Sequence, residues 1–140
     1  MVWTYWELGA DMCGTPSAAR KKWLSKLIAD LKLPKGTHAF WPVCLPEADA
    51  DGGSVLRANP DVFWAGIRKL GARMLVVIGT DAAKAIGLPM TGNTFFLCSN
   101  YRGIHATLIQ DFQQFMDSDN ARRYDSIVTY LRRIGRTYVR

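Results

Sequence analysis

His38 and His105 are the side chains of this sequence that most readily change charge near neutral pH. His105 follows Gly103 in a segment that we predict to be a loop, where an imidazole can reach a cleft and donate or accept a proton. His38 lies in an apolar stretch typical of a strand, which favours a structural role. No serine–histidine–aspartate spacing, metal-binding helix pair or pair of catalytic carboxylates stands out in the sequence, and we predict neither a metal site nor a cofactor.

Basic side chains gather in two parts of the sequence. Twelve of the 18 lysines and arginines lie at residues 20–35 and 122–140, and the net charge of +6 favours an anionic partner. The candidate contacts to nucleic acid are Arg20, Lys21, Lys22, Lys26, Arg122, Arg123, Arg132 and Arg133. They fall largely off the apolar stripes of two predicted helices, so a solvated face is the alternative. If both helices lie on the same side of the sheet, their charges form one phosphate-binding surface.

A tight turn at Gly79-Thr80-Asp81 joins an apolar strand to a helix. Backbone N–H groups at such a turn can hold an anion, which makes Gly79 and Thr80 a candidate anion-binding turn. The turn lacks the further glycines of a dinucleotide fingerprint and the lysine of a phosphate loop, and Asp81 would repel phosphate. An ordinary tight turn is the simpler interpretation.

The bulk composition is that of a globular protein. A chain of 140 residues, 49% hydrophobic and 21% charged, predicts one domain over residues 1–140. No run of eighteen apolar residues and no signal peptide is present, so we expect a cytoplasmic protein without a membrane partner. Cys13, Cys44 and Cys98 are odd in number and scattered, which predicts buried or partly buried free thiols.

Strands and helices alternate along the chain, and the clearest strand is the unbroken apolar run Met74–Ile78. The first half is predicted to contain a strand at 2–8, a helix at 16–33 capped by Thr15, a strand at 37–45 and a loop at 46–58. A helix at 60–70 capped by Asn59, a strand at 73–78 and a helix at 80–86 capped by Thr80 follow. The last part contains a short apolar run at 94–98 and helical segments near 108–116 and 120–134. This alternation predicts an α/β fold, a three-layer sandwich with a short, mostly parallel central sheet.

Three groups of segments, taken in order, resemble the uracil-DNA glycosylase superfamily, chiefly its single-domain bacterial branches. Gly14-Thr15-Pro16, the following helix and Leu33-Pro34 are similar to the family's Gly-x-Pro segment, first long helix and turn into the second strand. Residues 59–83 resemble the helix, strand and glycine turn that follow. Gly103-Ile104-His105-Ala106 stands where the family carries its His-Pro-Ser motif.

The resemblance implies roles for two residues. In this family an acidic residue orients the attacking water and a histidine stabilises the negative charge on the base, roles that the resemblance gives to Asp11 and His105. An asparagine after the second strand reads the base, but here that strand ends Phe40-Trp41-Pro42-Val43-Cys44. The resemblance therefore implies a degenerate member that does not excise uracil.

The segment from Thr107 to Leu131 is also similar to the psi-subunit family of the bacterial DNA polymerase III clamp-loader assembly, a non-catalytic version of this fold. Our leading hypothesis is a non-catalytic glycosylase-like domain acting as a binding module in a DNA-associated assembly. Its partner would be nucleic acid or a protein of a replication or repair assembly. The alternatives are a glycosylase-type hydrolase acting on a damaged base through Asp11 and His105, and a nucleotide- or anion-binding domain.

Overall fold

The centre of the molecule is a five-stranded sheet in the order β2-β1-β5-β7-β6. The computed structural model describes residues 1–14, 16–90, 96–109 and 121–138, and for residues 96–99 the backbone alone. Strands β1 (Val2–Tyr5), β2 (Ala39–Phe40), β5 (Met74–Ile78) and β7 (Ile104–Ile109) run parallel, and β6 (Phe96–Tyr101) pairs antiparallel with β7. The sheet is therefore mostly parallel, as the sequence predicts.

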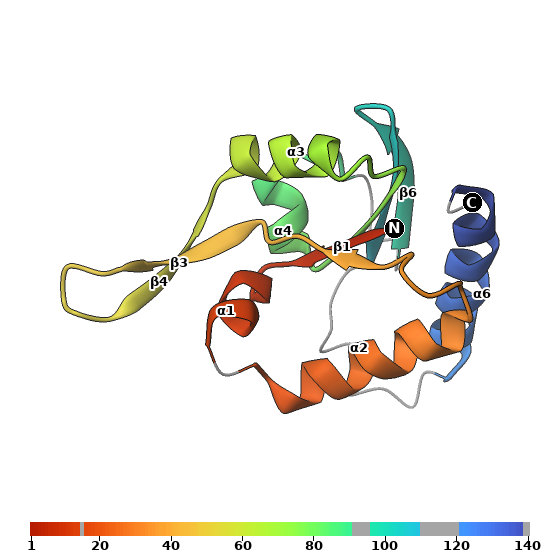
Figure 1. The fold of residues 1–140 in the computed structure, drawn as a ribbon, viewed down its shortest axis with the longest axis horizontal. Helices are drawn as coiled ribbons and strands as arrows, with labels where there is room; N and C mark the ends of the chain where they lie inside the picture. Colours follow the sequence, from red (N-terminus) through yellow and green to blue (C-terminus); the bar gives the residue numbers. More distant parts are fainter. Residues whose placement is uncertain (15, 91–95, 110–120, 139–140) are drawn as a thin grey trace.

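Helices cover both faces of this sheet (Figure 1). The helices are α1 (Leu8–Cys13), α2 (Ala18–Leu31), α3 (Pro60–Lys69), α4 (Thr80–Ala85) and α6 (Ala121–Tyr138). The side chains of α2 and α6 pack on one face with Val76 and Ile78 of β5, whereas those of α3 and α4 pack on the other with Leu75 and Val77. Successive side chains of a strand point to opposite faces, so β5 supplies both cores.

The prediction for β5 is confirmed, since all five residues from Met74 to Ile78 are buried and β1 and β7 flank the strand. The prediction for α3 is confirmed too. The Asn59 side chain accepts a hydrogen bond from the Val62 N–H at 3.2 Å, and Pro60 opens the helix, where its missing N–H costs nothing.

The first two elements differ from the prediction. The strand predicted at 2–8 ends at Tyr5, and α1 follows because Gly9 can pack directly on β3, where a Cβ would lie 1.9 Å from the Cys44 carbonyl oxygen. Helix α2 begins at Ala18 with Ser17 as its N-cap, and Thr15, the predicted cap, lies outside the described residues. The helix ends earlier than predicted because Lys32 adopts a left-handed conformation.

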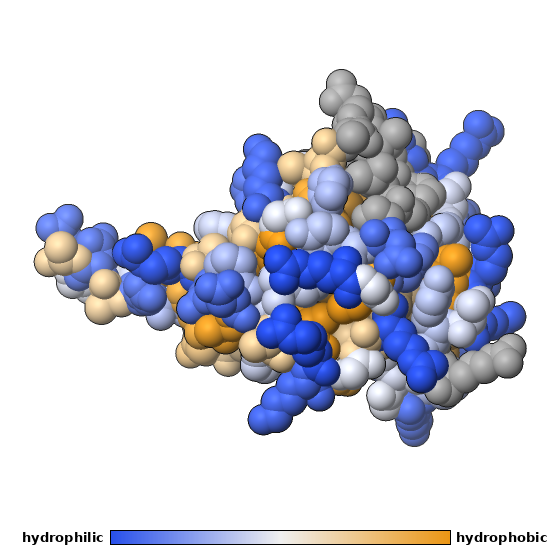
Figure 2. Space-filling model, turned by 90° about the horizontal axis from the view of Figure 1, so that it is seen from above, coloured by the Kyte–Doolittle hydropathy of each residue, from blue (hydrophilic) through white to orange (hydrophobic). Residues whose placement is uncertain are grey.

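The segment predicted as a loop at 46–58 is instead most of an antiparallel hairpin, β3 (Cys44–Ala48) and β4 (Ser54–Ala58). The strand predicted at 37–45 is correspondingly divided between β2 and the start of β3. The hairpin extends away from the central sheet (Figure 1), and hydrophilic and hydrophobic residues both lie on its surface (Figure 2). Glu47 and Arg57 form an ion pair of 2.6 Å across its two strands.

Three further predictions need correction. His105 lies in β7 and not in a loop, because the turn is confined to Arg102 and Gly103. Leu108 and Ile109 belong to the same strand, so the helix predicted from 108 is wrong at its start, and residues 110–120 lie outside the described part of the chain. Gly79, and not Thr80, is the N-cap of α4, with no side-chain hydrogen bond.

The last predicted helix is longer than expected, since α6 continues to Tyr138. Of the described cysteines, Cys44 is buried, whereas Cys13 is exposed, contrary to the prediction. None of the helices in the described residues has the length and apolar content that a membrane crossing requires.

Candidate nucleic-acid interface

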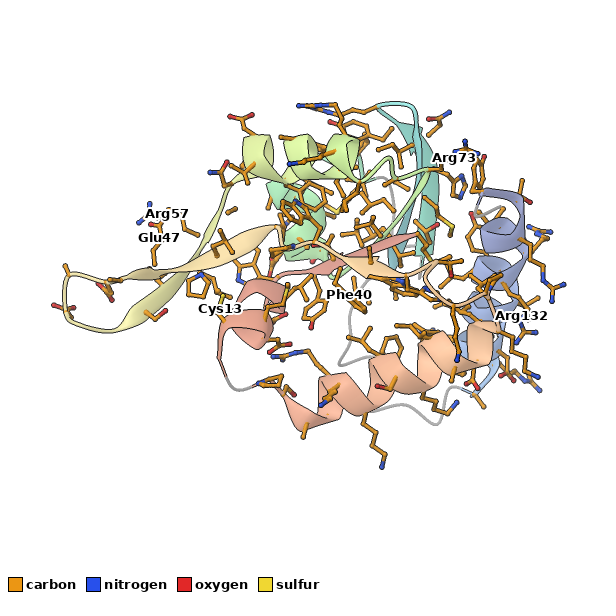
Figure 3. All side chains as sticks on the ribbon, viewed as in Figure 1. Cys13, Phe40, Glu47, Arg57, Arg73 and Arg132 are labelled. Carbon is orange, nitrogen blue, oxygen red and sulfur yellow. The ribbon has the colours of Figure 1, made fainter. Side chains whose placement is uncertain are left out.

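Helices α2 and α6, which carry all eight predicted nucleic-acid contacts, pack against one another on the same face of the sheet. The Tyr124 hydroxyl donates to the Asp30 carboxylate, and its ring meets the Trp23 ring edge to face at 6.4 Å. The guanidinium of Arg132 donates to the carbonyl oxygens of Asp30 and Leu31, and Figure 3 places Arg132 between the two helices. Helices α2 and α6 thus lie on the same face of the sheet, which is the condition for one shared basic surface.

Arg20, Lys26 and Arg132, among the predicted contacts, are engaged within the described part of the fold. Arg20 pairs with Asp11, and Arg132 caps the carbonyl end of α2. Lys26 pairs with Asp30 at 2.7 Å, with its ammonium 4.1 Å from the centre of the Tyr124 ring. Because these cations already hold partners, they contribute less to binding a phosphate.

The other five predicted contacts are exposed. Lys21 and Lys22 lie near the start of α2, Arg122 and Arg123 open α6, and Arg133 lies further along it, with its guanidinium 5.9 Å from the centre of the Tyr130 ring. These residues form the exposed basic part of what we name the α2/α6 surface.

Asp11, the candidate acid, is held by three residues. The guanidinium of Arg20 donates to both carboxylate oxygens, at 2.9 and 2.7 Å, the Tyr5 hydroxyl donates at 2.8 Å, and the Ser17 N–H donates at 3.4 Å. Burial opposes ionisation of Asp11, but the hydrogen bonds from Arg20 and Tyr5 outweigh it and hold its pKa below the usual value. Burial, and next to it the hydrogen bond to this carboxylate, raises the pKa of Tyr5.

A cavity of about 340 Å³ lies beside this cluster, between α1, α2 and the end of β2. Asp11, Ser17 and Lys21 contribute polar groups to its wall, and Phe40 contributes an aromatic ring. Because the Asp11 oxygens already accept four hydrogen bonds, this carboxylate is arranged as part of an ion pair and not as a base facing a water.

His105 lies at the opposite end of the strands from Asp11. In the sheet register His105 pairs with Met74 at the amino end of β5, whereas Tyr5, just before α1, pairs with Ile78 at the carboxyl end. Four residues of strand span roughly 13 Å, so the two candidate catalytic residues do not meet. Nε2 of His105 is instead 2.7 Å from the Tyr130 hydroxyl, and burial lowers the pKa of His105.

The turn at Gly79 and Thr80 uses its backbone within the fold. The Gly79 N–H donates to the Ile109 carbonyl at 2.7 Å, so this group is not available to an anion. Gly79 has a φ of +96°, a conformation that glycine adopts without strain and other residues rarely reach. The geometry is that of a tight turn.

Sequence reasoning missed a larger hollow at the amino ends of β1 and β5. This hollow, of about 730 Å³, is lined by apolar groups, among them Leu33, Leu70 and Ala72, and by Arg73, Arg136 and Tyr138. We name it the amino-edge hollow. No sequence motif marks it, because its residues come from four separate segments that only the sheet topology brings together. Among the described residues, no group of three or more histidine, cysteine, aspartate or glutamate side chains is arranged to hold a metal.

Comparisons of this chain with protein-family models, with curated proteins and with solved structures found no match.

Proposed function

We propose that this chain is a non-catalytic binding module of a DNA-associated assembly, which contacts nucleic acid through the α2/α6 surface. The observation that carries the proposal is the packing of α2 against α6 on one face of the sheet. This packing gathers onto one side of the molecule basic residues that lie about a hundred positions apart in the sequence.

The charge of these two helices supports the proposal. Together they hold nine lysines and arginines and only two acidic residues, Asp30 and Asp125. Asp30 is already paired with Lys26, so the exposed side chains present a strong excess of positive charge. Such a surface attracts the phosphate backbone without reading its sequence, because the gain comes from released counterions.

The non-catalytic part of the proposal is supported by the arrangement of the two candidate catalytic residues. Asp11 is bound by Arg20 and Tyr5 near the carboxyl ends of the strands, and His105 contacts Tyr130 near the amino ends. A glycosylase would need both groups around one flipped base.

We also propose that the fold is a degenerate version of the glycosylase fold. A mostly parallel sheet covered by helices on both faces is the architecture that the resemblance implies. The segment after β2, with Trp41, Pro42 and Val43, offers no side-chain amide to read a base edge. We therefore propose a binding role, with nucleic acid as one partner and a protein of a replication or repair assembly as another.

The test is a pair of charge-reversed variants with the same change in net charge. Lys21→Glu with Lys22→Glu alters the α2/α6 surface, whereas Arg68→Glu with Lys69→Glu alters α3 on the opposite face. Affinity for fluorescently labelled oligonucleotides is measured by anisotropy over a series of salt concentrations.

We expect the α2 variant to bind more weakly, with a slope of log K against log salt reduced by roughly 1.8 for two lost contacts to duplex phosphates. The α3 variant should bind like the unaltered protein. Equal losses in both variants would show that only net charge matters. Absence of binding at low salt would remove nucleic acid as a direct partner.

A further inference from the structure

The amino-edge hollow has the size and lining of a ligand site. Its volume of about 730 Å³ lies within the range of roughly 300–1,000 Å³ that ligand sites occupy. It opens between the residues that follow α2, those that follow α3, and the last turn of α6. It lies at the opposite end of the strands from the cavity beside Asp11.

The side chain of Tyr138, whose ring is stacked on His105, lines the amino-edge hollow. The Tyr138 ring is stacked on the His105 ring, with centres 5.2 Å apart and planes 21° apart, while 37% of Tyr138 is exposed. His105 is fixed in turn by its 2.7 Å contact with the Tyr130 hydroxyl. Because His105 covers one face of the ring and Tyr138 lines the hollow, its remaining surface is presented to a ligand.

Two arginines line the same hollow as this ring. Arg73 precedes β5 and Arg136 lies on the last turns of α6, and both line the hollow (Figure 3 labels Arg73, close to the end of α6). Among the described residues, no carboxylate lies within ion-pair distance of either guanidinium. The carbonyl ends of α2 and α3 place partial negative charge at this edge, and the two guanidinium groups offset it.

We propose that the amino-edge hollow binds single-stranded nucleic acid, with an unpaired base stacked on Tyr138 and phosphates held by Arg73 and Arg136. The inference rests on the proposed function and adds a preference for single strands. An aromatic ring beside cations is the arrangement that binds single strands without regard to sequence, because every base has a face that stacks. In a duplex both faces of an internal base are already covered by its neighbours.

An acidic peptide is the competing occupant, since its carboxylates would pair with the same arginines. The carboxylates of such a peptide do not stack on an aromatic ring, whereas a base does. The Tyr138 ring, which is stacked on His105, therefore favours a base. The two occupants are separated by an oligonucleotide that keeps its phosphates and lacks its bases.

The experiment compares a labelled ten-nucleotide oligothymidine, an abasic strand of the same length and a duplex, each by anisotropy. The variants are Tyr138→Ala, Tyr138→Phe, and Arg73→Gln with Arg136→Gln. We expect the oligothymidine to bind the unaltered protein more tightly than the other two ligands. Tyr138→Ala should weaken its binding about tenfold, the loss typical of one stacked base, and Tyr138→Phe should restore it. The double arginine variant should reduce the salt slope by roughly 1.4.

The outcomes separate this inference from the proposed function. If the Lys21→Glu, Lys22→Glu variant loses binding while Tyr138→Ala does not, the α2/α6 surface stands and the hollow is not a base site. Equal affinity for the oligothymidine and the abasic strand would also overturn base stacking. Absence of binding by any oligonucleotide at low salt would overturn both proposals. Far-ultraviolet circular dichroism of each variant confirms that the fold is intact.

Discussion

Replacement of Asp11 by asparagine should destabilise the protein, because this residue anchors α1 to α2 through Arg20. The side chains of Asp11 and Arg20 are 9% and 23% exposed, and the guanidinium makes two hydrogen bonds to the carboxylate. The asparagine amide would keep the shape of the carboxylate but would remove the negative charge that pairs with the guanidinium.

The magnitude follows from these contacts. A hydrogen bond to a charged group contributes roughly 1.5–3 kcal/mol, and breaking a buried ion pair costs roughly 3–5 kcal/mol. Because water still reaches part of Arg20, we expect a loss of about 2–3 kcal/mol in the free energy of unfolding. For a chain of this length, that loss lowers the melting temperature by roughly 7–10 °C.

The assay is thermal unfolding followed by circular dichroism at neutral pH, with Glu47→Gln as the matched control. Glu47 also pairs with an arginine, at 2.6 Å, but the side chains of Glu47 and Arg57 are 54% and 68% exposed. Such a surface pair contributes about 0–1 kcal/mol. An Asp11→Asn variant as stable as the unaltered protein, or more stable, would refute the structural role. Such a result would indicate that Asp11 serves a function and that its charge lowers the stability of the fold.

Two further predictions concern pH and catalysis. Burial lowers the pKa of both His38 and His105 below the ordinary value of 6.5. The unfolded chain therefore binds more protons than the folded protein below this pH, and the free energy of unfolding should fall as the pH is lowered from about 6.5 towards 5. Denaturant unfolding from pH 7.5 to 5 tests this, and a pH-independent midpoint would contradict it. The protein should produce no abasic sites in uracil-containing DNA, because Asp11 and His105 lie apart. Excision that disappears in both Asp11→Asn and His105→Ala would reverse this conclusion.

The parts of the fold that could be predicted are those where one physical pattern dominates. The run Met74–Ile78 has no polar residue, contains three β-branched residues and is followed by Gly79, which together favour a strand covered on both faces. Asn59-Pro60 before an apolar helical period marks the start of α3 without ambiguity. In both cases local preference and tertiary packing favour the same structure.

Other parts could not be predicted because two patterns compete. Leu108 and Ile109 end a buried strand, but together with Phe112 and Phe115 they also match a helical period, and periodicity alone cannot separate a buried strand from a buried helix. The hairpin was not predicted because Pro46 and several acidic residues in this segment are typical of a loop. Cross-strand pairs such as Glu47 with Arg57 stabilise it, and such pairs are not visible before the register is known.

The candidate site was predicted in part. The clustering of basic residues at both ends of the sequence is visible without a structure, but their proximity depends on α2 and α6 lying on one face. The partners of Arg20, Lys26 and Arg132 also could not be foreseen, since each contact depends on how separate helices pack. The amino-edge hollow left no trace in the sequence for the same reason.

The position of β5 between β1 and β7 determines when the molecule can assemble during its synthesis. Val2 is made well before its sheet partner Leu75, and β5 in turn pairs with β7 from residue 105 onward. Strand β2 can pair with one edge of β1 early, but the other edge remains without its partner strand while the hairpin and α3 are made. Since α6 packs on the same core, Trp3 and Tyr5 of β1 are fully shielded only after α6 has been made, and the nascent chain is exposed to chaperones and to aggregation until then.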